Sequence, residues 1–124
     1  MGRHRSPRPT DAELSILTVL WRRGPSTVRE VHEELSKVKP AGYTTILKFL
    51  QIMTEKELVV RDESRRSHVY EPRHSEDYTQ QLLVRDLLQR AFGGSVSGLI
   101  KQAFVVAPPS GEESKDIRNL LGSN

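Results

Sequence analysis

The stretch that decides the fold reads AGYTTILKFLQIMTEKE and covers residues 41–57. Apolar residues recur in it at helical spacing and predict one buried stripe, made of Ile46, Phe49, Leu50 and Met53. The opposite face begins with short polar side chains, carries one cation and meets its first acid only in the last turn. Such a face suits a phosphate backbone and base edges. The sequence thus predicts a helix that packs inward and contacts DNA outward, with a merely solvated outer face as the alternative.

Two shorter helices are predicted upstream of this stretch. Thr10 with Glu13, and Thr27 with Glu30, form two Thr-x-x-Glu capping boxes, which are start signals for helices. A Gly-Pro pair ends the first helix, and a later proline follows the second, which spans about residues 28–37. The predicted buried side chains are Leu14, Ile16, Leu17, Leu20 and Trp21 in the first helix and Val28, Val31 and Leu35 in the second.

A β-hairpin is predicted directly after the third helix. Residues 58–61 and 67–71 have the composition of strands, and the polar residues 63–66 form the turn between them. Three helices followed by a hairpin are the order of a winged helix-turn-helix. Long cations on the wing would reach the DNA backbone beside the third helix. The residues predicted to contact DNA are therefore Tyr43, Thr44, Thr45 and Lys48 from the helix and Arg65, Arg66 and His68 from the wing, with Arg61 near them.

The sequence divides into three predicted regions. Residues 1–9 hold three arginines and two prolines and predict a flexible basic arm, residues 10–73 form the winged helix, and residues 74–124 form a helical dimerisation segment. Lys and Arg outnumber Asp and Glu by 14 to 10 in residues 1–74, whereas residues 75–124 carry 5 against 6. Such an asymmetry is expected when one region meets a polyanion and the other meets protein.

The dimerisation segment is predicted to contain three short helices, separated by Gly-Gly and Pro-Pro. Each carries only a narrow apolar stripe, and helices this short are marginal in water alone. They are expected to pack against a second copy of the chain, and folding back onto their own winged helix is the alternative. The predicted dimer interface comprises Leu87, Leu88, Leu99, Ile100 and Phe104.

Composition excludes several other classes of protein. The chain of 124 residues has no cysteine, which excludes disulfides and thiol catalysis. Its apolar runs are too short to cross a membrane and no signal peptide is evident, so a cytoplasmic location without membrane insertion is expected. The four histidines have no metal-ligand spacing, and neither a phosphate loop nor a nucleophile motif is present. No catalytic residue, metal or cofactor is predicted, and the chain is not expected to be an enzyme.

Several segments together resemble the penicillinase-repressor family of bacterial winged-helix regulators. They are TDAELSILTVLW (residues 10–21), GPSTVREV (24–31), YTTIL (43–47), YEP (70–72) and FGGS (92–95), and the resemblance covers about residues 10–106. It implies a homodimeric repressor, of the kind that controls antibiotic resistance, on a dyad-symmetric promoter operator in double-stranded DNA. An upstream signal releases such repressors. The alternative from the fold alone is a winged helix that mediates protein contacts without sequence-specific DNA binding.

The resemblance also implies a route of release. In the family, the pathway of a membrane sensor metalloprotease cuts the repressor within the helix that corresponds to residues 96–106, before a phenylalanine preceded by asparagine. Here the phenylalanine is Phe104 and the residue before it is Ala103, so these two residues form the candidate cleavage site with one departure from the pattern. The copper-responsive branch of the family senses metal through cysteines, which this chain lacks.

Overall fold

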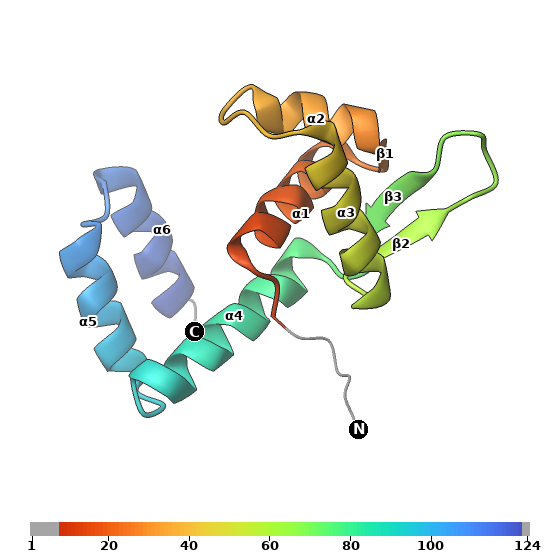
Figure 1. Cartoon of the computed structure of the whole chain (residues 1–124). Coiled ribbons are helices and arrows are strands. Elements are labelled where there is room, and N and C mark those ends of the chain that lie inside the picture. The colour runs from red at the N-terminus through yellow and green to blue at the C-terminus, as the bar shows by residue number, and fades with distance from the viewer. Residues whose placement is uncertain (1–7, 123–124) are drawn as a thin grey trace. The chain divides into compact units, whose positions relative to one another are not determined.

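The structure is a computed structural model that describes residues 8–122, so most of the predicted basic arm lies outside the described residues. In chain order, the elements are α1 (Asp11–Arg23), β1 (Ser26–Thr27), α2 (Val28–Ser36), α3 (Tyr43–Glu55), β2 (Val59–Asp62), β3 (Val69–Pro72), α4 (Glu76–Ala91), α5 (Val96–Val106) and α6 (Gly111–Leu121). The mainly helical fold class is confirmed, with three helices and a wing hairpin followed by three further helices (Figure 1).

The predicted capping boxes are present and set where the helices begin. The Glu13 backbone N–H donates to Thr10 Oγ1 at 3.2 Å, and the Thr10 N–H donates to Glu13 Oε1 at 2.9 Å. Thr27 and Glu30 repeat this reciprocal pair at the start of α2. The Thr27 N–H holds the pKa of Glu30 below its ordinary value, and a hydrogen bond and ion pair with Arg23 add to this effect. Each box satisfies backbone donors that a helix start leaves open.

The core of the winged helix is built from all three helices and the sheet. Its buried members are Ile16, Leu17, Leu20, Val28, Val31, Ile46, Leu50, Met53, Leu58, Val59 and Tyr70. Of the predicted stripe on α3, Phe49 is only partly buried and packs at the edge of this cluster. Trp21 is also partly buried, and its Nε1–H donates to the His74 carbonyl oxygen at 3.1 Å. This bond attaches the beginning of the segment after the wing to α1.

A third strand, β1, was not predicted from the sequence. It pairs antiparallel with β3, with Ser26 opposite Tyr70 and Thr27 opposite Val69, and gives the sheet order β1-β3-β2. Two residues are too few to show the alternating pattern from which strands are predicted. The strand matters because it ties the start of α2 to the base of the wing. The loop between β2 and β3 projects from the rest of this unit (Figure 1).

The third helix is shorter than the predicted span of residues 41–57. Gly42 has an extended backbone and serves as the N-cap without a side-chain hydrogen bond. At the other end, the Glu57 N–H donates to Thr54 O and the Leu58 N–H donates to Met53 O, which is a Schellman motif. Glu57 takes the left-handed conformation of that motif, with φ of 63°, a place that glycine usually occupies. The helix therefore ends sharply and turns directly into β2.

A buried ion pair joins the start of α1 to the end of α3. Lys56 Nζ lies 2.8 and 2.9 Å from the two carboxylate oxygens of Glu13. The Glu13 side chain is 3% exposed and the Lys56 side chain 26%. Glu13 thus caps its own helix and anchors α3 at the same time.

The chain divides into two compact units, Met1–Leu83 and Val84–Asn124. The division falls inside α4, ten residues after the predicted boundary between residues 73 and 74, because the first turns of α4 stay with the winged helix. Thr79 is buried there, at 6% exposure. In the second unit, α5 and α6 contain no buried residue, although serines, Ser95 and Ser110, cap the N-termini of these helices.

The Glu13–Lys56 pair leads to a stability prediction. Lys56→Ala leaves a buried carboxylate without its cation, so we expect the free energy of unfolding to fall by about 3 kcal/mol, the low end for a broken buried pair. Urea denaturation measures the loss. Lys37→Ala is the matched control, because Lys37 pairs with Glu34 on the surface, and such pairs contribute about 0.5 kcal/mol. Equal small losses in the two variants would show that the Glu13–Lys56 pair does not anchor α3.

Candidate nucleic-acid interface

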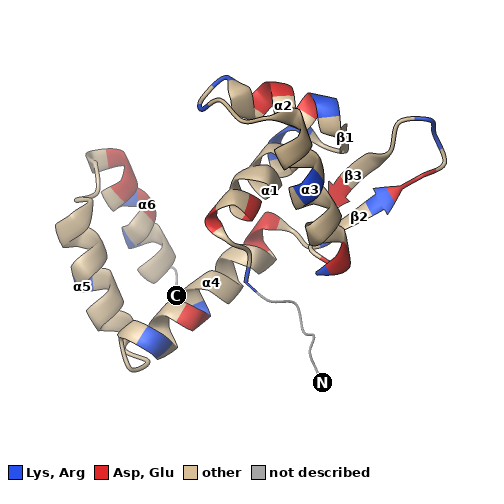
Figure 2. Ribbon diagram, in the orientation of Figure 1, with Lys and Arg blue, Asp and Glu red and all other residues tan. Residues whose placement is uncertain are grey.

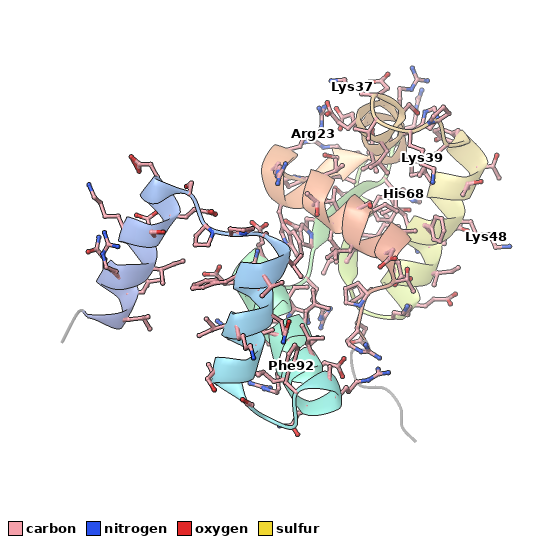
Figure 3. All side chains as sticks on the ribbon, turned by 90° about the vertical axis from the view of Figure 1, so that its left-hand side faces the viewer. Arg23, Lys37, Lys39, Lys48, His68 and Phe92 are labelled. Atoms are coloured by element: carbon pink, nitrogen blue, oxygen red, sulfur yellow. The ribbon has the colours of Figure 1, made fainter. Side chains whose placement is uncertain are left out.

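The outer face of α3 is exposed because its opposite face is buried. Ile46, Leu50 and Met53 are at most 3% exposed. Helical spacing then directs Thr44 and Lys48 to solvent, and both are exposed. The Lys48 side chain extends away from the unit (Figure 3). The predicted contact face of α3 is thus a continuous surface that a nucleic acid can reach.

The wing loop presents the other predicted cations. Arg65, Arg66 and His68 are all exposed in the loop between β2 and β3. The loop is held at its start by Asp62, whose Oδ1 accepts the Ser64 N–H at 2.9 Å. This hydrogen bond also holds the pKa of Asp62 below its ordinary value. Blue segments mark cations at the beginning of α2, on α3 and along the wing loop (Figure 2).

The sequence groups Arg61 with these exposed cations, but the structure separates it from them. It lies on β2 opposite Tyr70, and its guanidinium is 2.6 Å from the Glu63 carboxylate. Hydrogen bonds to Tyr70 and then to Glu63 raise the pKa of Arg61 above its ordinary value. Its charge is neutralised within the wing, so Arg61 supports the hairpin instead of extending from it.

One groove brings three of the predicted residues together. Tyr43, Arg66 and His68 line it, and Arg29 of α2 lines it as well. Leu47 and Tyr70 are also among its lining residues. Sequence reasoning missed Arg29, because a single cation in a short helix carries no signal of its own. It would have been found only by placing the start of α2 beside the wing, which is what strand β1 does.

The position of Tyr43 is fixed by a histidine on α2. His32 Nε2 lies 2.7 Å from the carbonyl oxygen of Ala41, which makes this nitrogen the donor. The His32 ring also meets the Tyr43 ring edge-on, with 5.9 Å between centroids. His32 therefore holds the turn before α3 and the first residue of that helix.

Thr45 lies on a different flank of α3 from Tyr43. It lines a separate groove with Asp11 and Phe49, on the side of α3 that faces the start of α1. It is exposed, but it does not share the groove of Tyr43 and the wing. The structure thus brings Tyr43, Arg66 and His68 together, leaves Thr44 and Lys48 on the open face, and separates Thr45 from the wing.

Acidic partners are unevenly distributed among the cations. Arg23 pairs with Glu30 at 3.0 Å and with Glu34 at 3.6 Å on the far side of α2. Within residues 8–122, by contrast, no carboxylate forms an ion pair with Arg29, Lys48 or Arg66. The cations near the groove and the outer face of α3 therefore retain charge for an external anion.

The residues predicted for the dimer interface remain accessible in the single chain. Leu87, Ile100 and Phe104 are 45%, 39% and 41% exposed, and Leu88 and Leu99 are half-buried. Ala103, which precedes Phe104 on α5, is exposed too. The second unit thus carries a large apolar surface that its own helices do not cover.

Neither a cluster of metal-ligating side chains nor a membrane-spanning helix is found among the described residues. Among them, no three His, Cys, Asp or Glu side chains gather closely enough to hold a metal ion. None of the helices in this part of the chain is both long and apolar enough to cross a bilayer.

Comparisons with known proteins connect this geometry to a family. The model of the family described as penicillinase repressor matches residues 9–123. The transcriptional regulator BlaI of Mycobacterium tuberculosis is 39% identical over 82 residues, which are 65% of this chain and 59% of that protein. The chain thus spans less than two thirds of this relative's length. The penicillinase repressor of Bacillus licheniformis is 26% identical over 115 residues, which are 93% of this chain and 90% of that protein.

Solved structures agree with the winged-helix assignment. The solution structure of the DNA-binding domain of the repressor BlaI matches with a TM-score of 0.53 and 30% identity, over 60% of this chain and 90% of that domain. A second match is monomeric B. licheniformis BlaI in complex with the blaP half-operator, with a TM-score of 0.51, 30% identity, and coverage of 59% and 89%. Each of these similarities covers about three fifths of this chain.

Proposed function

Because this chain belongs to the penicillinase repressor family, we propose that it is a homodimeric transcriptional repressor that binds a dyad-symmetric promoter operator. The observation that carries the proposal is the exposed outer face of α3, beside a wing whose tip is basic. In this role α3 enters the major groove, where Thr44 and Lys48 contact base edges. Arg65, Arg66 and His68 contact the backbone from the wing. A relative in this family has been solved in complex with a half-operator, which supports the same role.

Dimerisation is proposed to occur through the second unit. Val84, Leu87, Ile100 and Phe104 expose apolar surface there, and α5 has no buried residue in the single chain. A second copy would cover this surface, since helices of 11 residues are marginal without partners. Two winged helices in one dimer can read two half-sites about 34 Å apart on one face of the duplex. The dimer thereby gives the operator its two-fold symmetry.

Release from DNA is proposed to follow a cut before Phe104, made in the pathway of a membrane sensor metalloprotease. Phe104 and Ala103 are exposed on α5 in the single chain, and this helix supplies part of the proposed dimer interface. A cut at that bond splits α5 and detaches α6 from the winged helix. Alanine in place of the family's asparagine changes the residue that the protease reads, so the specificity of the protease must differ here.

The DNA-binding role is tested with Lys48→Ala. Fluorescence anisotropy compares DNA from upstream of the protein's own gene with a scrambled duplex at several salt concentrations. We expect the intact chain to prefer the native duplex, with log affinity falling by about 0.9 per neutralised phosphate as log salt rises. Lys48→Ala should bind the native duplex about tenfold more weakly, since one such contact contributes about 1–3 kcal/mol. The control, Lys115→Ala on α6, should bind normally. Weak binding with a flat salt dependence would instead indicate a protein-contact module.

The dimer is tested with Ile100→Asp. Ile100 is 39% exposed in the single chain, so the protomer tolerates the charge, but an apolar interface does not. We expect light scattering to show a monomer and circular dichroism to show at least the helix content of the winged helix, since α5 and α6 are marginal without a partner. Gln102→Asp adds the same charge to the other side of α5 and should leave the dimer intact. A dimeric Ile100→Asp protein would place the interface elsewhere.

The release mechanism is tested with a chain that ends at Ala103. We expect it to be monomeric and to bind a duplex with two half-sites on the order of 100-fold more weakly than the intact chain, because linkage of the two winged helices is lost. Binding to a duplex with one half-site should change little, since the winged helix itself is intact. Operator affinity equal to that of the full chain would rule out release by this cut.

A further inference from the structure

Arg29 has no explanation in the stability of the fold. It is the second residue of α2, where the positive end of the helix macrodipole disfavours a cation. Its side chain is exposed, and no acid within residues 8–122 forms an ion pair with it. Arg23 of α1, by contrast, is neutralised by two acids of α2, Glu30 and Glu34. An unneutralised arginine in an unfavourable position suggests an anionic partner from outside the chain.

The surroundings of Arg29 indicate which anion that is. Arg29 lines the same groove as Tyr43, Arg66 and His68, so α2, α3 and the wing each contribute a donor. Leu47, half-buried, and Tyr70, 1% exposed, are apolar members of the lining. Two guanidinium groups, a phenol and an imidazole beside apolar side chains form an environment in which charge-assisted hydrogen bonds to phosphate are strong.

We propose that Arg29, Tyr43, Arg66 and His68 form a phosphate clamp, which holds one phosphodiester group of the DNA backbone. The clamp rests on the proposed function, because it acts only if α3 meets DNA. It deepens that function by assigning α2 a direct role in binding. Arg29 of α2 and Arg66 of the wing bind the same phosphate, so one backbone group holds both α2 and the wing.

His32 acts in the clamp as a positioning residue. Its bond of 2.7 Å to Ala41 O and its edge-on contact with the Tyr43 ring hold Tyr43 at the edge of the groove. Tyr43 is 48% exposed, so without the contact with His32 its side chain would rotate freely in the unbound protein. Binding would then have to order it, at a cost in free energy. A donor that is already in place binds phosphate at a lower entropic cost.

The clamp and Lys48 should affect binding in different ways. A phosphate contact carries no sequence information, whereas a base contact does. We expect Arg29→Ala to weaken binding to native and scrambled duplexes by the same factor, about five- to tenfold, and to lower the salt slope by about 0.9. Arg22→Ala is the matched control: it removes the same charge from an exposed site on α1 outside this groove and should leave the slope unchanged.

A second experiment locates the phosphate. The shortest bound upstream duplex is prepared with a single neutral methylphosphonate at each backbone position in turn. At the clamped position, the substitution should weaken binding by the intact chain and add little to the effect of Arg29→Ala. The same position should also add little to the effect of Arg66→Ala. At all other contacted positions, the effects should multiply.

The possible results distinguish a failure of the clamp alone from a failure of the proposed function. A normal salt slope for Arg29→Ala, in a chain that still prefers native DNA and is weakened by Lys48→Ala, overturns the clamp and leaves the repressor role standing. If the methylphosphonate position that adds little to Arg29→Ala differs from the one that adds little to Arg66→Ala, the two arginines bind separate phosphates. This result overturns the single clamp. If Arg29→Ala weakens binding to the native duplex but not to the scrambled one, Arg29 contacts bases and the clamp is overturned. Failure of the intact chain to bind either duplex overturns both proposals.

Discussion

The burial of one stripe on α3 is the constraint on which the rest of the winged helix depends. Ile46, Leu50 and Met53 pack against the other helices and the sheet, and this contact fixes the rotation of α3 about its own axis. Once that rotation is fixed, helical geometry determines that Lys48 faces solvent. The ends of the helix are fixed by separate means, the Glu13–Lys56 ion pair with a Schellman turn at one end and the His32–Ala41 hydrogen bond at the other. A surface with such rigid support can bind DNA without first being ordered.

The distribution of acids separates cations that support the fold from cations that are available for binding. Lys56, Arg23 and Arg61 each have an acidic partner within 3.0 Å, and each holds two elements or two parts of one element together. Arg29 and Arg66 have no such partner within residues 8–122, although both are exposed in the same unit. Net charge alone does not reveal this difference, because paired and unpaired cations count equally in it. The local balance of charge is therefore a better guide to an anion-binding surface than composition.

The sequence was most informative where a structure depends on residues close together in the chain. Capping boxes link residues three positions apart, and a helical stripe repeats within two turns, so α1, α2 and α3 were predicted with their buried faces. Strand β1 and the position of Arg29 depend on pairing between Thr27 and Val69, which lie far apart in sequence and share no local pattern. Arg61 was grouped with the exposed wing cations because its ion pair with Glu63 and its hydrogen bond with Tyr70 depend on side-chain direction on a strand. Thr45 was grouped with Tyr43 by the sequence analysis for a similar reason. The structure places them on different flanks of α3, because residues two positions apart in a helix point about 200° apart.

The two units differ in how their apolar residues are covered, and this difference gives the proposed repressor a means of release. The winged helix buries its apolar residues within one chain, so its core does not depend on a second copy. The second unit exposes Ile100 and Phe104, so in the proposed dimer its stability depends on the second copy and therefore on concentration. Linking two DNA-binding modules multiplies affinity without any new contact. In the proposed dimer, a signal that separates the two copies thus abolishes tight binding while it leaves every residue proposed to contact DNA in place.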